Sequence, residues 1–163
     1  MAYTVFLSHS GKDQWLTTII ANTAREFGVE ILIAEREQKL GQHLDEKISN
    51  MIDKSNCVIA LLTQNAIGLT NVNQEIGYAI KSGKPLIPFV TKGTPSEKLG
   101  VLLEGKEYIE YDITRPSDAL TDLIHYVVSL KSKNDKDDQN NTLILVGLGA
   151  LALLGLSSLG GEK

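Results

Sequence analysis

Residues 57–63 (Cys-Val-Ile-Ala-Leu-Leu-Thr) form a nearly unbroken apolar run, and this run restricts the possible folds more than any other part of the chain. A strand covered by helices on both faces of a parallel sheet is apolar throughout, whereas a strand with one wet face alternates apolar and polar residues. The run therefore predicts a central strand of an α/β domain.

Short apolar runs and amphipathic segments alternate along the rest of the chain. Such alternation predicts a parallel sheet with helices on both faces. The other expected strands are residues 3–7, 29–33, 85–90 and 107–111. Apolar residues at helical spacing predict four helices, with a further short helix over 97–103. Their inner faces include Leu16 and Ile20, Ile48 and Ile52, Val72 and Ile76, and Leu120 and Leu123.

Polar residues and glycines mark the expected helix ends. Ser10 or Asp13 can cap the first helix, because both side chains accept hydrogen bonds from free backbone N–H groups. Gly28 and Gly83 should end the first and third helices, since glycine adopts a positive φ without steric cost.

Three polar segments follow expected strands, namely residues 8–13, 34–42 and 64–75. In open parallel sheets, ligands bind outside the carboxyl ends of the strands. We therefore expect these segments to converge on one edge of the sheet and to form a site there.

Composition excludes several classes of site. The net charge is -4 with no basic block in the globular part, which argues against a nucleic-acid partner. Cys57 is the single cysteine, so no internal disulfide can form, and its place in an apolar run predicts a buried, inert thiol. His9, His43 and His125 lack paired spacing, and we expect no metal site.

The C-terminal part of the chain differs from the domain that precedes it. We expect a domain over residues 1–131, a polar linker over 132–141 and a transmembrane helix over 142–161, a segment without charges. A helix of that length spans about 30 Å, the thickness of the hydrocarbon core of a bilayer. The alternative is a buried helix of a soluble protein.

Charges around this segment predict its orientation. Lys131, Lys133 and Lys136 precede it, whereas Lys163 follows it. Because cytoplasmic flanks carry the excess of basic residues, we expect a single-pass protein of the cell membrane with its domain in the cytoplasm.

Familiar nucleotide-binding motifs are missing from the sequence. There is no GxxxxGK[ST], and no GxGxxG follows the first strand. A phosphorylated receiver domain needs acidic residues after the first strand and an Asp at the end of the third. Here the two strands end in Leu7-Ser8-His9-Ser10 and Leu62-Thr63-Gln64, without these acidic residues. The sequence therefore does not fit a receiver domain.

Several segments together resemble the Toll/interleukin receptor (TIR) domain family. Residues 5–13 look like its first box, and residues 40–42 (Leu-Gly-Gln) resemble the end of its BB loop. Residues 73–79 and 83–88 resemble a helix and the following strand of prokaryotic TIR domains. The resemblance covers residues 3–130 and implies the TIR fold, an α/β, flavodoxin-like five-stranded parallel sheet with helices on both faces.

The resemblance also implies an activity. Many prokaryotic TIR domains cleave NAD⁺ into nicotinamide and ADP-ribose or a cyclic form of it, and several serve anti-phage defence. Their catalytic carboxylate corresponds to Glu75, and NAD⁺ is a substrate, so no cofactor is implied. The turn after the first strand and the BB loop line the pocket. The implied substrate-binding positions are Ser8, His9, Ser10, Ala34, Arg36, Lys39, Gly41 and Asn71.

One carboxylate suffices for this chemistry. Nicotinamide is cationic in NAD⁺ and leaves as a neutral molecule, so no general acid is needed, unlike in most glycosidases. The transition state resembles a ribosyl oxocarbenium ion, which a nearby anion stabilises.

Each candidate also has a simpler interpretation. Glu75 can be an ordinary acidic residue that favours the positive end of a helix. His9 can pack locally in its turn instead of contacting a phosphate, and Tyr78 can pack as well. Arg36 and Lys39 can belong to a solvated charged face.

The sequence departs from the family at two places. Asn71 stands where many active members have Trp, and Lys39-Leu40 precede Gly41 where many relatives have Pro.

Two hypotheses follow: an NADase activated when copies of the chain assemble at the lipid bilayer, or a TIR scaffold without catalysis. A third is that the clustered tail disrupts membranes.

Overall fold

A computed structural model describes residues 2–34, 46–100 and 103–137 of the chain. Its strands form one parallel sheet in the order β2-β1-β3-β4-β5, the flavodoxin-like order. The expected five-stranded parallel sheet is thus confirmed. The strands are β1 (Tyr3–Ser8), β2 (Val29–Leu32), β3 (Cys57–Leu62), β4 (Leu86–Thr91) and β5 (Ile109–Tyr111).

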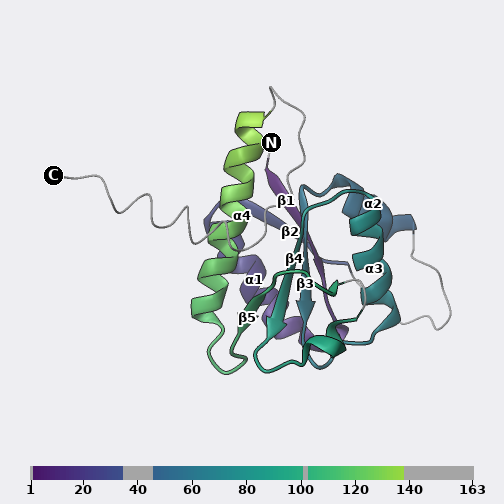
Figure 1. Ribbon diagram of the computed structural model, residues 1–163. Coiled ribbons are helices and arrows are strands. Elements are labelled where there is room, and N and C mark those ends of the chain that lie inside the picture. The colour runs from purple at the N-terminus through teal and green to yellow at the C-terminus, as the bar shows by residue number, and fades with distance from the viewer. Residues whose placement is uncertain (1, 35–45, 101–102, 138–163) are drawn as a thin grey trace.

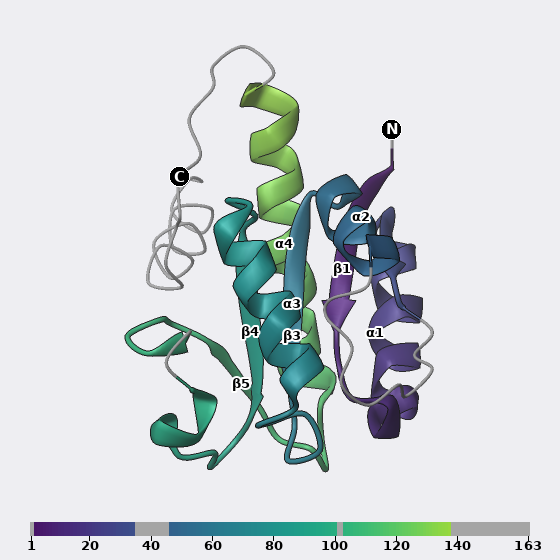
Figure 2. The same cartoon turned by 90° about the vertical axis from the view of Figure 1, so that its right-hand side faces the viewer.

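Helices cover both faces of the sheet, as Figure 1 shows. One layer holds α1 and α4, and the other holds α2 and α3, which lie in front of the sheet in Figure 2. The helices are α1 (Gln14–Glu26), α2 (Glu46–Lys54), α3 (Thr70–Lys81) and α4 (Ser117–Asp137). Two short 3₁₀ helices are η1 (Gly11–Asp13) and η2 (Ser96–Leu99), the latter overlapping the first part of the short helix expected over 97–103.

Strand β3 is buried along its whole length, as its apolar run predicts. Alternate side chains point to opposite faces of a strand. Ile59 and Leu61 accordingly pack into the layer of α1 and α4, whereas Val58 and Ala60 pack toward α2 and α3.

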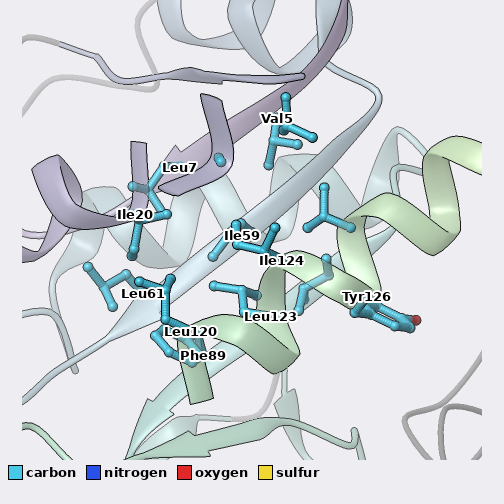
Figure 3. Packing of buried hydrophobic residues seen from close by; sticks show 14 of the residues in the cluster. Val5, Leu7, Ile20, Ile59, Leu61, Phe89, Leu120, Leu123, Ile124 and Tyr126 are labelled. Atoms are coloured by element: carbon cyan, nitrogen blue, oxygen red, sulfur yellow. The ribbon is translucent and has the colours of Figure 1, made fainter. Parts of the chain in front are cut away.

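The layer of α1 and α4 holds the largest apolar cluster, shown in Figure 3. Ile20 from α1 and Leu123 and Ile124 from α4 meet Ile59 on the sheet. Burying one such side chain contributes about 1.5–3 kcal/mol, so this layer supplies much of the stability of the domain.

Glycine ends two helices as expected. Gly28 follows α1 with a φ of 70°, and its N–H donates to the Arg25 carbonyl at 3.1 Å. Gly83 follows α3 with a φ of 66°, and the N–H of Lys84 reaches back to the Ala79 carbonyl at 3.0 Å. These bonds satisfy carbonyl groups that a helix end would leave open.

Helix α4 is longer than expected. It continues to Asp137, so residues 132–137, part of the expected linker, are helical. Extending an existing helix adds one hydrogen bond per residue without a new nucleation step. The polar segment can therefore continue α4 as a helix. The end of α4 rises beyond the neighbouring helices in Figures 1 and 2.

The expected transmembrane helix over residues 142–161 lies outside the described residues. Of the helices that are described, none combines the length and the apolar character that a membrane span requires.

Candidate functional site

The candidate site lies where the chain changes direction across the sheet. From β1 the chain continues to β2 on one side, whereas β3 leads to β4 on the other. The two neighbouring strands pair in parallel, with Ser8 at the end of β1 opposite Ala60. Crevices at such switch points are the usual ligand sites of open α/β sheets.

Glu75 is buried at this point, with an exposed fraction of 0%. It lies on α3 beside Ile76, which packs against the sheet together with Val72. The sequence places Glu75 at the edge of the apolar face of α3, and in the structure this edge lies between the helix and the sheet. Glu75 is not a solvent-exposed helix residue.

Ser8 holds the carboxylate in place. Its hydroxyl donates a hydrogen bond of 2.5 Å to Oε2 of Glu75, and Ser8 itself is 0% exposed. A distance this short is typical of hydroxyl bonds to a charged acceptor. Burial of a carboxylate is costly unless it is hydrogen-bonded, so Ser8 both orients Glu75 and makes its burial tolerable.

The other polar residues of the turn after β1 are also buried. His9 places Nδ1 3.0 Å from the carbonyl oxygen of Leu7, and Ser10 accepts a bond of 3.3 Å from the N–H of Lys12. Both side chains are 3% exposed. Both of these contacts lie within residues 7–12.

Asp13 differs from its expected role as a cap. It precedes α1, but its side chain makes no capping bond to the helix. Its Oδ2 instead accepts a hydrogen bond of 2.6 Å from the hydroxyl of Thr63, and its Oδ1 accepts one of 2.7 Å from the side-chain amide of Asn65. Sequence reasoning missed this bridge. The available signal was that Asp13 lies in the segment after one predicted strand and that Thr63 ends another predicted strand of the same sheet.

The structure brings together two of the three segments expected at this edge. Residues 8–13 contact residues 64–75 through the bonds of Ser8 with Glu75 and of Asp13 with Asn65. Of the third segment only Ala34 is described, and it is buried in the cluster with Phe6 and Ala79.

The remaining implied positions differ in what can be said of them. Asn71 lies in the first turn of α3, one turn before Glu75, and is exposed. Arg36, Lys39 and Gly41 lie outside the described residues.

Tyr78 contacts α2 and not the carboxylate edge. Its hydroxyl donates a hydrogen bond of 2.9 Å to Oδ2 of Asp53, and this bond raises the pKa of Tyr78. Tyr78 therefore has the packing role given as its simpler interpretation.

Two further ionisable groups near the sheet are held neutral. Cys57 is buried as expected, and burial raises the pKa of its thiol to about 12, which favours the unreactive neutral form. Burial, aided by the charge of Asp13, also raises the pKa of Tyr111, whose hydroxyl is bonded to Thr91 at 3.0 Å. Within the described part of the chain, no cluster of three His, Cys, Asp or Glu residues could hold a metal ion.

Comparison with known proteins identifies the family. Residues 5–124 match the model of the family described as "TIR domain". No curated protein sequence gave a significant match.

Solved structures with a similar fold include two of interest. One is the CMP N-glycosidase BcmB of Clostridium botulinum, at 22% identity over 76% of this chain and 98% of that chain, with a TM-score of 0.52. Another is a prokaryotic SEFIR domain, at 16% identity over 76% of this chain and 91% of that chain, with a TM-score of 0.58. At these identities the similarity concerns the fold.

Proposed function

Since this chain belongs to the TIR domain family, we propose that it cleaves the N-glycosidic bond of NAD⁺, with Glu75 as its catalytic carboxylate. The observation that carries the proposal is the buried Glu75, oriented by Ser8 at the switch point of the sheet. The CMP N-glycosidase of similar fold acts, by its name, on an N-glycosidic bond as well.

The proposed reaction uses the carboxylate as an electrostatic partner. The bond between C1′ of the ribose and the ring nitrogen breaks, and its electron pair goes to the nitrogen, which releases neutral nicotinamide. The carboxylate of Glu75 stabilises the positive charge that develops on the ribose. Water then adds to C1′ and loses a proton, giving ADP-ribose, or a nitrogen of the adenine adds there, giving a cyclic product.

Further residues would bind the rest of the substrate. In the proposed pocket, Ser8, His9 and Ser10 contact the ribose and phosphates from the turn after β1. Ala34, Arg36, Lys39 and Gly41 contribute from the BB loop, where the two basic side chains would neutralise the pyrophosphate. Asn71 would contact the substrate from the exposed first turn of α3.

The proposal includes activation by self-assembly. Ser8 and Glu75 are both 0% exposed, so a substrate cannot contact the carboxylate in the conformation described. Contacts between copies of the chain would supply the free energy that opens the pocket, as the family resemblance implies for the BB loop.

A membrane anchor would favour this assembly. We propose that residues 142–161 span the cell membrane, that residues 132–141 join this helix to the domain of residues 1–131, and that the domain lies in the cytoplasm. Confining copies to one surface raises their effective concentration. From the family resemblance we also propose a role in prokaryotic anti-phage immunity.

The test is nicotinamide release from NAD⁺ by the full chain at high concentration, with a crowding agent, read by chromatography. Glu75→Gln keeps the size of the side chain and removes its charge, and it should lower the rate by about 10²–10³. Glu46→Gln, at an exposed position in the first turn of α2, is the matched control and should leave the rate unchanged.

The second candidate is a TIR scaffold without catalysis, favoured by Asn71 in place of the family Trp. CMP is included as an alternative substrate in the same assay. If neither compound is consumed while the chains assemble, and Glu75→Gln leaves assembly unchanged, the scaffold replaces the enzyme. The product peak from an active protein distinguishes hydrolysis from cyclisation.

A further inference from the structure

We infer that Asp13 is a positioning residue for Glu75, because its carboxylate clamps the turn after β1 to the segment that leads into α3. The inference rests on the proposed function and adds to it a second polar link across the switch point. The first link is the direct bond from Ser8 to Glu75.

The clamp uses both oxygens of Asp13. Thr63 donates to Oδ2 at 2.6 Å, and Asn65 donates to Oδ1 at 2.7 Å. Asp13 and Thr63 are each 2% exposed, so water competes little for the bond between them, whereas Asn65 is exposed and its bond is partly buried. The N–H of Asp13 also donates 3.0 Å to the Ser10 carbonyl, which ties the clamp to the turn that holds Ser8.

On the other side, Thr63 organises the start of the segment toward α3. Its hydroxyl oxygen accepts bonds from the N–H groups of Asn65 at 3.1 Å and Ala66 at 3.2 Å while it donates to Asp13. Its carbonyl accepts from Ala66 and Ile67, each at 3.0 Å. The hydroxyl thus joins the carboxylate directly to a folded backbone turn.

This turn continues into the helix that carries Glu75. The N–H of Leu69 donates to the Ala66 carbonyl at 3.1 Å, and the N–H of Asn73 donates to the Leu69 carbonyl at 3.0 Å. Leu69 is the N-cap of α3 and supplies no side-chain capping bond. The first turn of α3 is therefore joined through these backbone bonds to the preceding turn and to the clamp, in addition to the packing of Val72 against the sheet.

Asp13 itself does not touch the reacting atoms in this scheme. Its two oxygens are occupied by Thr63 and Asn65, and its side chain is buried away from solvent. Its effect on catalysis would come through the placement of Glu75. Misplacing a catalytic group by about 1 Å can cost about 10²-fold in rate.

Asp13→Asn is the sharpest variant, since it keeps the shape but turns an amide N–H₂ toward one of the two donors. In the full chain, it should lower kcat for NAD⁺ by about 10-fold to 10²-fold, with KM changed less than twofold. Thr63→Val, which removes the bridging hydroxyl, should have the same effect. Thr63→Ser, which retains the hydroxyl, should restore most of the rate.

Ser55→Ala is the control for lost stability. Ser55 is 2% exposed and donates 2.7 Å to the Ile52 carbonyl near the opposite end of β3. It should lower the melting temperature without lowering kcat. If Asp13→Asn and Thr63→Val lower kcat no more than Ser55→Ala does, Asp13 is merely structural and the inference is wrong.

A second readout separates this inference from the proposed activity. In protein labelled with ¹³C at glutamate carboxyl groups, the Glu75 signal is assigned by its loss in Glu75→Gln. Asp13→Asn should shift this signal and speed amide exchange at Ala66 and Asn73, whereas Ser55→Ala should do neither. If the wild type consumes no NAD⁺, the proposed function fails, and these signals still decide the clamp. If Asp13→Asn does not fold, the same measurements on Thr63→Val test the clamp instead. If the Glu75 signal and the amide exchange rates are unchanged in the variant, the inference is wrong.

Discussion

The two ends of strand β3 bury polar groups in opposite ways. At the amino end, Cys57 is surrounded by apolar side chains, and burial raises the pKa of its thiol to about 12. At the carboxyl end, Thr63 donates to the buried carboxylate of Asp13, and the neighbouring strand ends in Ser8, which donates to Glu75. One end keeps its ionisable group neutral, and the other gives each carboxylate a hydroxyl donor.

This difference shows that burial alone does not indicate a functional group. The cation at the amino end, Lys84, donates 2.7 Å bonds to the carbonyls of Asp53 and Ser55 and so completes the end of α2. The hydroxyl donors at the carboxyl end instead orient carboxylates at a switch point, where open α/β sheets bind ligands. The first set of contacts serves stability, and the second set would serve the proposed chemistry.

The largest effect on stability should come from the middle of the strand, which both ends share. Ile59 is 0% exposed and lies in the cluster of Figure 3. Ile59→Ala should lower the free energy of unfolding by about 2–5 kcal/mol, since it removes apolar contacts and leaves a cavity. Urea denaturation measures the loss. The rate of NAD⁺ cleavage per folded molecule should stay within twofold of the wild-type rate. A larger drop would mean that the contribution of β3 to stability cannot be separated from its contribution to the proposed site.

The middle and the amino end of β3 could be predicted from the sequence because apolar runs report burial directly. The apolar residues 57–63 predicted the central strand, and Cys57 at its start predicted an inert thiol. Local patterns of this kind depend on neighbours in the chain, which the sequence lists in order.

The carboxyl end could be predicted only in part. The convergence of segments after the strands followed from the rule for parallel sheets, and the family resemblance indicated Glu75. The burial of Glu75 depends on how α3 is rotated against β1, which spacing leaves open because Glu75 is adjacent to Ile76 at the edge of the apolar face. The bond from Thr63 to Asp13 joins residues 50 positions apart, and local reasoning favoured a helix cap instead.

The next effect compares one chemical change at the two edges of the sheet, at Ser8 at the carboxyl end of β1 and at Ser55 just before the amino end of β3. Ser8→Ala removes a donor to a buried carboxylate, which should cost about 1–3 kcal/mol, whereas Ser55→Ala removes a bond to a backbone carbonyl and should cost about 0.5–1.5 kcal/mol. Urea denaturation of both variants near neutral pH provides the comparison. Ser8→Ala should also slow NAD⁺ cleavage, because the carboxylate loses its orienting partner. Equal costs for both variants would mean that the bond to Glu75 is not charge-assisted.

The smallest effect tests the amino end through the pH dependence of stability. The thiol of Cys57 has a pKa of about 12 when folded, against the ordinary value of 9.0 that describes the unfolded chain. Above about pH 9 the unfolded state therefore loses this proton while the folded state keeps it, so stability is fully present below that pH and falls as pH rises toward about 12. The loss from this one group should be about 1.4 kcal/mol between about pH 8 and about pH 10.

Cys57→Ala isolates this loss from that of Tyr111, because the causes that raise the pKa of Tyr111 do not include Cys57 and its contribution cancels. Urea denaturation at the two pH values should give a steeper decline for the wild type than for the variant, by about 1.4 kcal/mol. The offset that the smaller side chain causes at neutral pH does not affect this difference in slope. Parallel declines would show that the thiol ionises as readily in the folded protein as in the unfolded chain. The amino end of β3 would then hold a reactive thiolate, and the contrast between its two ends would be lost.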